Sequence, residues 1–162
     1  MNILYFDPRS LLYSSNYLNQ NDDVRRIYEL QPFLSNTDLL MKNVTPDRKG
    51  AQRLADAANS VGFLLYPTGE RFTRELLIKH TVFTENQLAA FVDLTYKVRL
   101  DDRDPVRLML AHANALNATW FICGDVATDD RLKAFTGKAL LSAINEGVSD
   151  SLISQINKLS HI

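Results

Sequence analysis

Two short apolar segments that end in an aspartate constrain the fold of this chain more than any other feature. The segment from Ile3 to Phe6 is followed at once by Asp7, and the segment 120–124 is followed by Asp125. If both segments are central parallel strands, their carboxyl ends meet at one edge of the sheet, where open α/β folds bind ligands. Two carboxylates at that edge would suit Mg²⁺.

Strand-like and helix-like patterns alternate along the rest of the chain. The continuous apolar run 61–66 predicts a strand buried on both faces, which ends in a tight loop carrying Thr68. Residues 45–47 (Thr-Pro-Asp) and residues 104–105 (Asp-Pro) carry helix-start signals, with a capping side chain and a proline for the first helical position. The first of these helices should run to about Asn59.

Three further patterns complete the predicted order of elements. Thr84 and Gln87 have the spacing of a capping box, which predicts a helix continuing through Leu88 to Val92. Residues 138–144 predict an edge strand, and a final helix begins after Ser149 or Asp150. Alternation of this kind favours a three-layer α/β/α sandwich with a mostly parallel central sheet.

Size and charge limit the classes of protein to consider. A chain of 162 residues with 46% hydrophobic and 23% charged content is expected to form one domain, 1–162. A net charge of −1 provides no general basic field for a polyanion. The amino terminus lacks a signal-peptide pattern and no apolar run is long enough for a membrane, so we expect a cytoplasmic protein. The single Cys123 predicts an inert buried thiol.

The order of these parts resembles the haloacid dehalogenase-like (HAD) superfamily. The resemblance is carried by a strand ending in Asp7, a strand ending in Thr68, a basic region before a helix, and a strand ending in Gly124-Asp125 with two more acids at 129–130. It spans Ile3 to about Leu159. The turn at 146–149 into the last helix is similar to the small HAD domains of RNA-repair proteins. No large cap fits, so a small cap or insert is expected at about 14–43.

The resemblance implies a Rossmannoid fold and a Mg²⁺-dependent phosphohydrolase. Its substrate would be a phosphorylated small molecule or a nucleic-acid end. Asp7 would be the covalent nucleophile and a metal ligand, forming an aspartyl-phosphate. Thr68, with Gly69, would hold the phosphoryl group. Asp125 would bind the metal ion, with Asp129 or Asp130 as a second acid.

The cation of the site is left open among three residues. Lys97 precedes the helix that leads to the strand 119–123, while Arg99 and Arg103 can be reached from the same loop. The resemblance implies that one of them balances the charge of the phosphoryl group, with Lys97 in the catalytic role and Arg103 in substrate binding.

Arg9 is the main departure from the pattern of this superfamily. Its phosphatases usually carry a second aspartate two residues after the nucleophile, as general acid and base. A guanidinium cannot take a proton from water near neutral pH. Turnover is therefore predicted to be weak or absent. Arg9 could bind a phosphate group bidentately, or it could hold Asp7 in an ion pair.

Two other functions stay open at this point. A fold of this type without turnover could serve as a binding protein for another protein or a phosphorylated ligand. Alternatively, Asp7, Glu75, Asp104 and Asp125 could form the acidic quartet of a PIN-type ribonuclease around two metal ions. The sequence at 8–9 (Pro-Arg) argues against the nuclease, because a small polar pair usually follows the first acid there.

Overall fold

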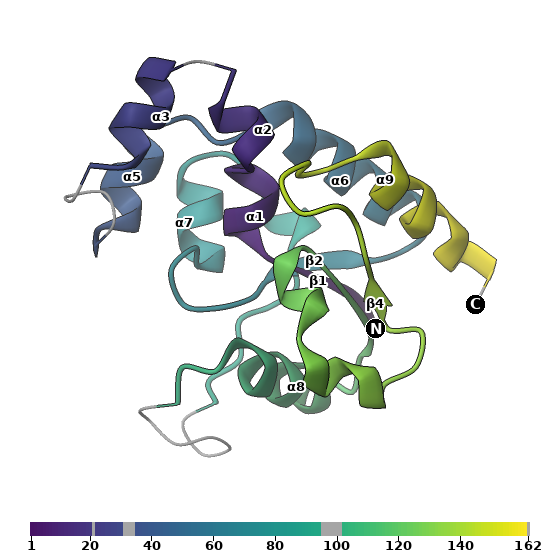
Figure 1. Ribbon diagram of the computed structural model, residues 1–162. Coiled ribbons are helices and arrows are strands. Elements are labelled where there is room, and N and C mark those ends of the chain that lie inside the picture. Colours follow the sequence, from purple (N-terminus) through teal and green to yellow (C-terminus); the bar gives the residue numbers. More distant parts are fainter. Residues whose placement is uncertain (21, 31–34, 95–101, 162) are drawn as a thin grey trace.

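The sheet of this protein has four parallel strands with helices on both faces (Figure 1). The structure is a computed structural model that describes residues 1–20, 22–30, 35–94 and 102–161. Within these ranges the strand order is β2-β1-β3-β4. The strands are β1 (Asn2–Phe6), β2 (Leu64–Pro67), β3 (Thr119–Cys123) and β4 (Ala139–Leu140). The predicted three-layer α/β/α sandwich is confirmed.

Most of the helices lie on one face of the sheet. In Figure 1, α1, α6, α7 and α9 lie on that face, and α8 lies on the other. The described α-helices are α1 (Pro8–Leu12), α2 (Ser15–Leu18), α3 (Asp22–Tyr28), α5 (Thr37–Asn43), α6 (Arg48–Ser60), α7 (Arg74–Lys79), α8 (Pro105–Ala115) and α9 (Asp150–Asn157). Short 3₁₀ helices are η1 (Glu85–Gln87), η2 (Asp125–Thr128), η3 (Asp130–Ala134) and η4 (Lys158–His161). In these ranges no helix has both the length and the apolar character needed to cross a membrane.

The central strand β1 divides the hydrophobic core into two parts. Leu4 and Phe6 belong to the cluster under α1, α6 and α9, whereas Ile3 and Tyr5 belong to the cluster under α8. All four side chains are fully buried. Such burial stabilises the fold by about 1.5–3 kcal/mol for each large apolar side chain. The continuous apolar run of the sequence thus reflects a strand covered on both faces.

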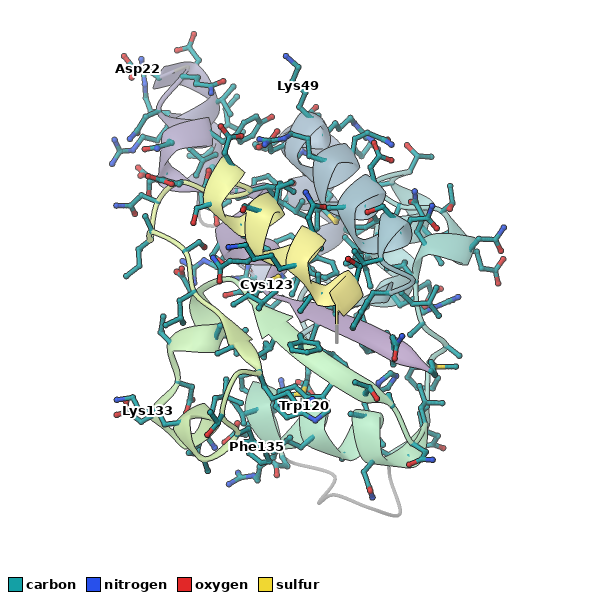
Figure 2. All side chains as sticks on the ribbon, turned by 90° about the vertical axis from the view of Figure 1, so that its right-hand side faces the viewer. Asp22, Lys49, Trp120, Cys123, Lys133 and Phe135 are labelled. Carbon is teal, nitrogen blue, oxygen red and sulfur yellow. The ribbon has the colours of Figure 1, made fainter. Side chains whose placement is uncertain are left out.

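Both ends of β3 can be located in Figure 2. Trp120, near the start of the strand, packs edge-on against Phe135 with ring centroids 5.3 Å apart. Cys123 ends the strand and is fully buried, as the sequence predicts. In the same view α3, marked by Asp22, lies on the side of the molecule toward which β3 runs. The carboxyl edge of the sheet is therefore the edge nearest to α3.

The long helix α6 begins two residues later than its start signal predicts. The expected helix start at residues 45–46 is wrong, because Asp47 is the capping residue and Arg48 is the first helical residue. The Asp47 carboxylate accepts a hydrogen bond from the Gly50 backbone N–H at 2.9 Å. The predicted apolar face of the helix is buried, with Leu54 fully enclosed.

The capping box at Thr84 forms, but the predicted helix after it does not. Only the 3₁₀ turn η1 follows, and Leu88 then forms a parallel bridge with Leu65 of β2. The Ala89 backbone N–H donates to the Leu65 carbonyl oxygen at 2.8 Å. Pairing with the sheet replaces the hydrogen bonds that a continued helix would have made, so tertiary contacts outweigh the local signal.

The predicted edge strand at 138–144 is also shorter than expected. Only Ala139 and Leu140 pair with β3. Leu141 and Ile144 are 56% and 61% exposed. Apolar residues continue to Ile144 in the sequence, but β3 pairs with this segment only at Ala139 and Leu140.

A buried hydrogen bond joins β1 to α8. The Tyr5 hydroxyl lies 2.7 Å from His112 Nδ1, and His112 Nε2 lies 2.8 Å from the Ala90 carbonyl oxygen. Because a carbonyl oxygen only accepts, we assign the proton to Nε2 and the accepting role to Nδ1. Burial lowers the pKa of His112, which favours this neutral form.

We expect Tyr5→Phe to lower the free energy of unfolding by about 1–3 kcal/mol, because it leaves the buried His112 Nδ1 without a donor. Urea unfolding measures the change. Tyr17→Phe is the matched control, since the Tyr17 hydroxyl donates to the Thr45 carbonyl oxygen at an exposed site. Its cost should stay within about 0.5 kcal/mol. Equal costs for the two variants would contradict the assignment.

Candidate functional site

The carboxyl ends of β1 and β3 form a topological switch point. The two strands are neighbours, yet the chain leaves them toward opposite faces of the sheet. After β1, Leu11 and Leu12 of α1 enter the core under α6, and after β3, Ala127 of η2 enters the core under α8. Diverging connections of this kind open a crevice at the strand ends. Asp7 and Asp125 stand at this crevice.

Direct contacts hold the two strand ends together. The Asp7 backbone N–H donates to the Cys123 carbonyl oxygen at 3.2 Å. The Asp125 backbone N–H donates to Ser10 Oγ at 3.0 Å. Gly124 has a φ of +89°, and a Cβ placed on it would lie 2.8 Å from the Asp7 Cβ. A glycine is therefore required where the β3 exit passes the nucleophile candidate.

A cleft of about 680 Å³ opens over these residues. We call it the Asp7 cleft; Asp7, Arg9, Ser10 and Asp125 line its end at the sheet. Residues of α2 and α3, which belong to the predicted insert at 14–43, also line the cleft, and so does Asn145. This volume is within the range of small-molecule binding sites.

The environment of Asp7 disfavours its negative charge. Burial is the main cause that raises the pKa of the Asp7 carboxyl. The Ser10 hydroxyl acts in the opposite direction, and the negative charge of Asp125 raises the pKa further. A cation shared by the two carboxylates would relieve both the burial cost and the repulsion.

The donor set of the Asp7 cleft fits Mg²⁺. This ion commonly takes one or two carboxylates and completes its coordination with water and phosphate oxygens. Asp7 and Asp125 supply two such carboxylates. Across the described ranges, no cluster of three or more His, Cys, Asp or Glu side chains is found that could enclose a metal ion by itself. The remaining ligands would thus come from solvent and substrate.

The carboxylate of Asp129 is engaged by an arginine. Arg131 donates to Asp129 through its backbone N–H, Nε and Nη2 at 2.9, 3.0 and 2.8 Å, and this pairing lowers the pKa of Asp129. Arg131 also pairs with Asp104, whose pKa it lowers to about 2. Asp130 pairs with Lys133 at 2.9 Å. A metal-binding role for Asp129 or Asp130 stays a prediction.

Thr68 stands at the end of β2, beside β1, but it faces a different hollow. Its backbone N–H and its hydroxyl both donate to the Phe6 carbonyl oxygen, at 2.9 and 3.2 Å. Thr68 and Gly69 line a hollow of about 260 Å³ together with Tyr66 and His112 on the α8 side. Thr68 and Gly69 do not line the Asp7 cleft, and their role as phosphoryl ligands stays a prediction.

Of the predicted cations, Arg9 lies in the Asp7 cleft. Its side chain is exposed, and within the described residues it makes no hydrogen bond or ion pair. Arg103 is 83% exposed, pairs with Glu70 at 3.5 Å and lines a separate hollow. Lys97 and Arg99 lie outside the described residues. Among the predicted cations that the structure describes, Arg9 is thus the one that lines the same cleft as the two acids.

The four acids of the predicted nuclease quartet lie in different surroundings. Asp7 and Asp125 share the Asp7 cleft. Asp104 caps α8, accepting from the Val106 backbone N–H at 2.9 Å, and pairs with Arg131. Glu75 lies on α7 and lines another hollow. The structure therefore does not gather all four acids around one cleft.

Sequence reasoning missed Ser10 and Asn145 as residues of the cleft. Asp7-Pro8 has the same acid-then-proline signature that correctly predicted the start of α8, and it starts α1 with Pro8 as the first helical residue. A helix that starts at Pro8 has Ser10 on its first turn, close to Asp7. For Asn145, a turn residue with a φ of +77°, no such local signal was present.

Comparisons of the chain with protein-family models, with curated proteins and with solved structures found no match.

We expect Gly124→Ala to destabilise the protein more than Gly137→Ala. Both glycines have positive φ, +89° and +79°, and an alanine there costs about 1–2 kcal/mol. No atom lies within 4 Å of a Cβ at Gly137, whereas a Cβ at Gly124 overlaps with Asp7. Overpacking should add about 1–3 kcal/mol to the cost of Gly124→Ala, measured by urea unfolding. Equal costs would show that the two strand ends are not packed together.

We expect Asp7→Asn to raise the free energy of unfolding near pH 7. Folding raises the pKa of this carboxyl above its ordinary value of 3.8, so the folded state holds the proton more strongly than the unfolded chain. Stability then falls as pH rises from 3.8 through the folded pKa. The gain should vanish at about pH 3, where both states are protonated.

Urea unfolding without divalent cations at both pH values measures this difference. Asp56→Asn, an exposed change on α6, is the matched control. A loss of stability for Asp7→Asn near neutral pH would contradict the electrostatic picture of the cleft.

Proposed function

We propose that this protein is a Mg²⁺-dependent enzyme of phosphoryl transfer that uses Asp7 as its nucleophile. The observation that carries the proposal is the meeting of Asp7, Asp125 and Arg9 at a switch-point cleft. Two carboxylates for a divalent ion and an uncommitted guanidinium are the groups that phosphoryl transfer requires. The resemblance to the HAD superfamily points to the same chemistry.

Each residue has a definite part in the proposed reaction. The Asp7 carboxylate attacks the phosphorus atom of a phosphate ester, the bond from phosphorus to the leaving oxygen breaks, and an aspartyl-phosphate forms. Arg9 donates to the phosphoryl oxygens, which it can do bidentately. Asp7 and Asp125 would hold Mg²⁺, which when bound neutralises charge on the phosphoryl oxygens. A water molecule then attacks the phosphorus atom and loses a proton to solvent, the bond from phosphorus to the Asp7 oxygen breaks, and inorganic phosphate leaves, which regenerates the Asp7 carboxylate.

The shape and charge of the Asp7 cleft favour a small phosphorylated molecule as substrate. Arg25 is the other arginine among its lining residues, and it is already paired with Glu29 at 3.2 Å. A nucleic-acid end carries several phosphates, and its binding usually draws on several basic residues. Arg9, the arginine of the cleft without an ion pair among the described residues, suits a ligand with one phosphate group.

The test is Mg²⁺-dependent release of phosphate from p-nitrophenyl phosphate. We expect activity that disappears with EDTA, is lost in Asp7→Asn, and falls roughly 10²-fold or more in Asp125→Asn. Asp56→Asn is the matched control and should keep full activity. Asp129→Asn should keep its activity if Asp7 and Asp125 alone hold the ion, and it should lose activity if Asp129 is a third ligand.

Isothermal titration of the same variants with Mg²⁺ gives a second measurement that does not need turnover. We expect weaker binding in Asp7→Asn and in Asp125→Asn than in the control. Binding of Mg²⁺ that is unchanged in both variants, or phosphate release that survives in Asp7→Asn, would overturn the proposal.

A further inference from the structure

The Asp7 cleft contains few groups that could remove a proton from water. Apart from Asp7 and Asp125, Glu29 is the single carboxylate among its described lining residues, and no histidine is among them. Arg25 holds Glu29 through Nε at 3.2 Å and is itself fixed by Asn19 Oδ1 at 2.9 Å. Oε1 of Glu29 is thus already occupied by the Arg25 guanidinium.

In the proposed function Asp125 would hold the metal ion, and three other residues that line the described cleft do not supply a base either. The Tyr13 hydroxyl is committed to the Val44 carbonyl oxygen at 2.8 Å, and burial raises the pKa of this phenol. Ser10 Oγ already accepts the Asp125 backbone N–H. Arg9 stands beside Asp7, and a guanidinium offers only donors. Arg9 can therefore bind a phosphoryl group on Asp7, but it cannot activate the water that removes it.

The two halves of the proposed reaction depend differently on this lack of a base. In the first half, the Asp7 carboxylate needs no deprotonation before it attacks phosphorus. If the leaving group departs as a stable anion, no acid is needed either, which applies to acyl phosphates and to aryl phosphates with acidic phenols. In the second half, water attacks and must lose a proton, a step that a positioned base accelerates by roughly 10²–10⁴-fold.

We propose that the protein retains the phosphoryl group on Asp7 instead of releasing it rapidly. This inference rests on the proposed function, because it takes Asp7 as the nucleophile. The donor is a phosphate with an anionic leaving group, of which acyl phosphates are the main class. The bond from Asp7 to phosphorus forms, the bond from phosphorus to the acyl oxygen breaks, and a carboxylate leaves. The phosphorylated chain then persists, with Arg9 paired to the phosphoryl oxygens.

The experiment mixes the full chain with Mg²⁺ and acetyl phosphate and follows the intact mass. We expect the mass of one phosphoryl group to be added to each chain and to be removed by hydroxylamine, which cleaves acyl phosphates. Asp7→Asn should gain none. Glycerol phosphate, an alkyl phosphate whose leaving group needs a proton, should also give none.

Arg9→Asp tests the reason for retention. It places a carboxylate beside Asp7 on the exposed side of α1, and we expect the phosphorylated chain to decay roughly 10²–10⁴-fold faster after the donor is removed. Arg9→Asn is the matched variant, similar in size but without a base, and its decay should stay within about tenfold of the parent chain. Circular dichroism and urea unfolding verify that both variants fold.

Different outcomes overturn different parts of the proposal. Many turnovers of p-nitrophenyl phosphate with no phosphorylated chain detectable would overturn retention and leave the proposed function standing. Equal decay of Arg9→Asp and Arg9→Asn would overturn the explanation by a missing base. No phosphorylation from acetyl phosphate, together with no Mg²⁺-dependent phosphate release, would overturn both retention and the proposed function.

Discussion

The close approach of the β1 and β3 exits is the constraint on which the rest of the site depends. Gly124 passes so near Asp7 that a methyl group would not fit, and the Asp7 backbone is bonded to the Cys123 carbonyl oxygen. Ser10 then ties α1 to the Asp125 backbone. Because backbone contacts set this spacing, the two acids are brought together whatever occupies the cleft. The positions of Asp7 and Asp125 are therefore fixed by the packing of β1 against β3.

This arrangement has an electrostatic consequence. Asp7 is half-buried, and the negative charge of Asp125 adds to the cost of ionising it. A protein that keeps two acids in this position holds a local preference for a cation or a proton, and functional sites commonly carry such perturbed groups. Arg9 stays exposed beside them without an ion pair in the described part of the chain. The ion pair of Arg9 with Asp7 is therefore not formed among the described residues, and anion binding by Arg9 stays a prediction.

The fold follows local signals closely except where long-range contacts override them. Asp104-Pro105 starts α8 as predicted, and Ser149, one of the two predicted caps, is the cap of α9. The capping box at Thr84 forms, but Leu88 pairs with β2 instead of extending a helix. A local pattern indicates that a helix can start at a residue. It does not indicate whether a strand lies close enough to form hydrogen bonds with the same backbone groups.

Several properties of the site were contained in the sequence alone: an acid after each of two strands, a hydroxyl after a third, and an arginine where a proton acceptor is usual in the resembling superfamily. These properties can be read from residue types and from the alternation of strand-like and helix-like segments, because both depend only on neighbours along the chain. The tertiary structure decided which groups meet. In the folded chain the Thr68 hydroxyl donates to the Phe6 carbonyl oxygen, and Asp129 forms an ion pair with Arg131. Ser10 Oγ accepts a hydrogen bond from the Asp125 backbone N–H. Hydrogen bonds and ion pairs form with whichever partner folding brings near, and for Ser10 that partner lies 115 residues away along the chain.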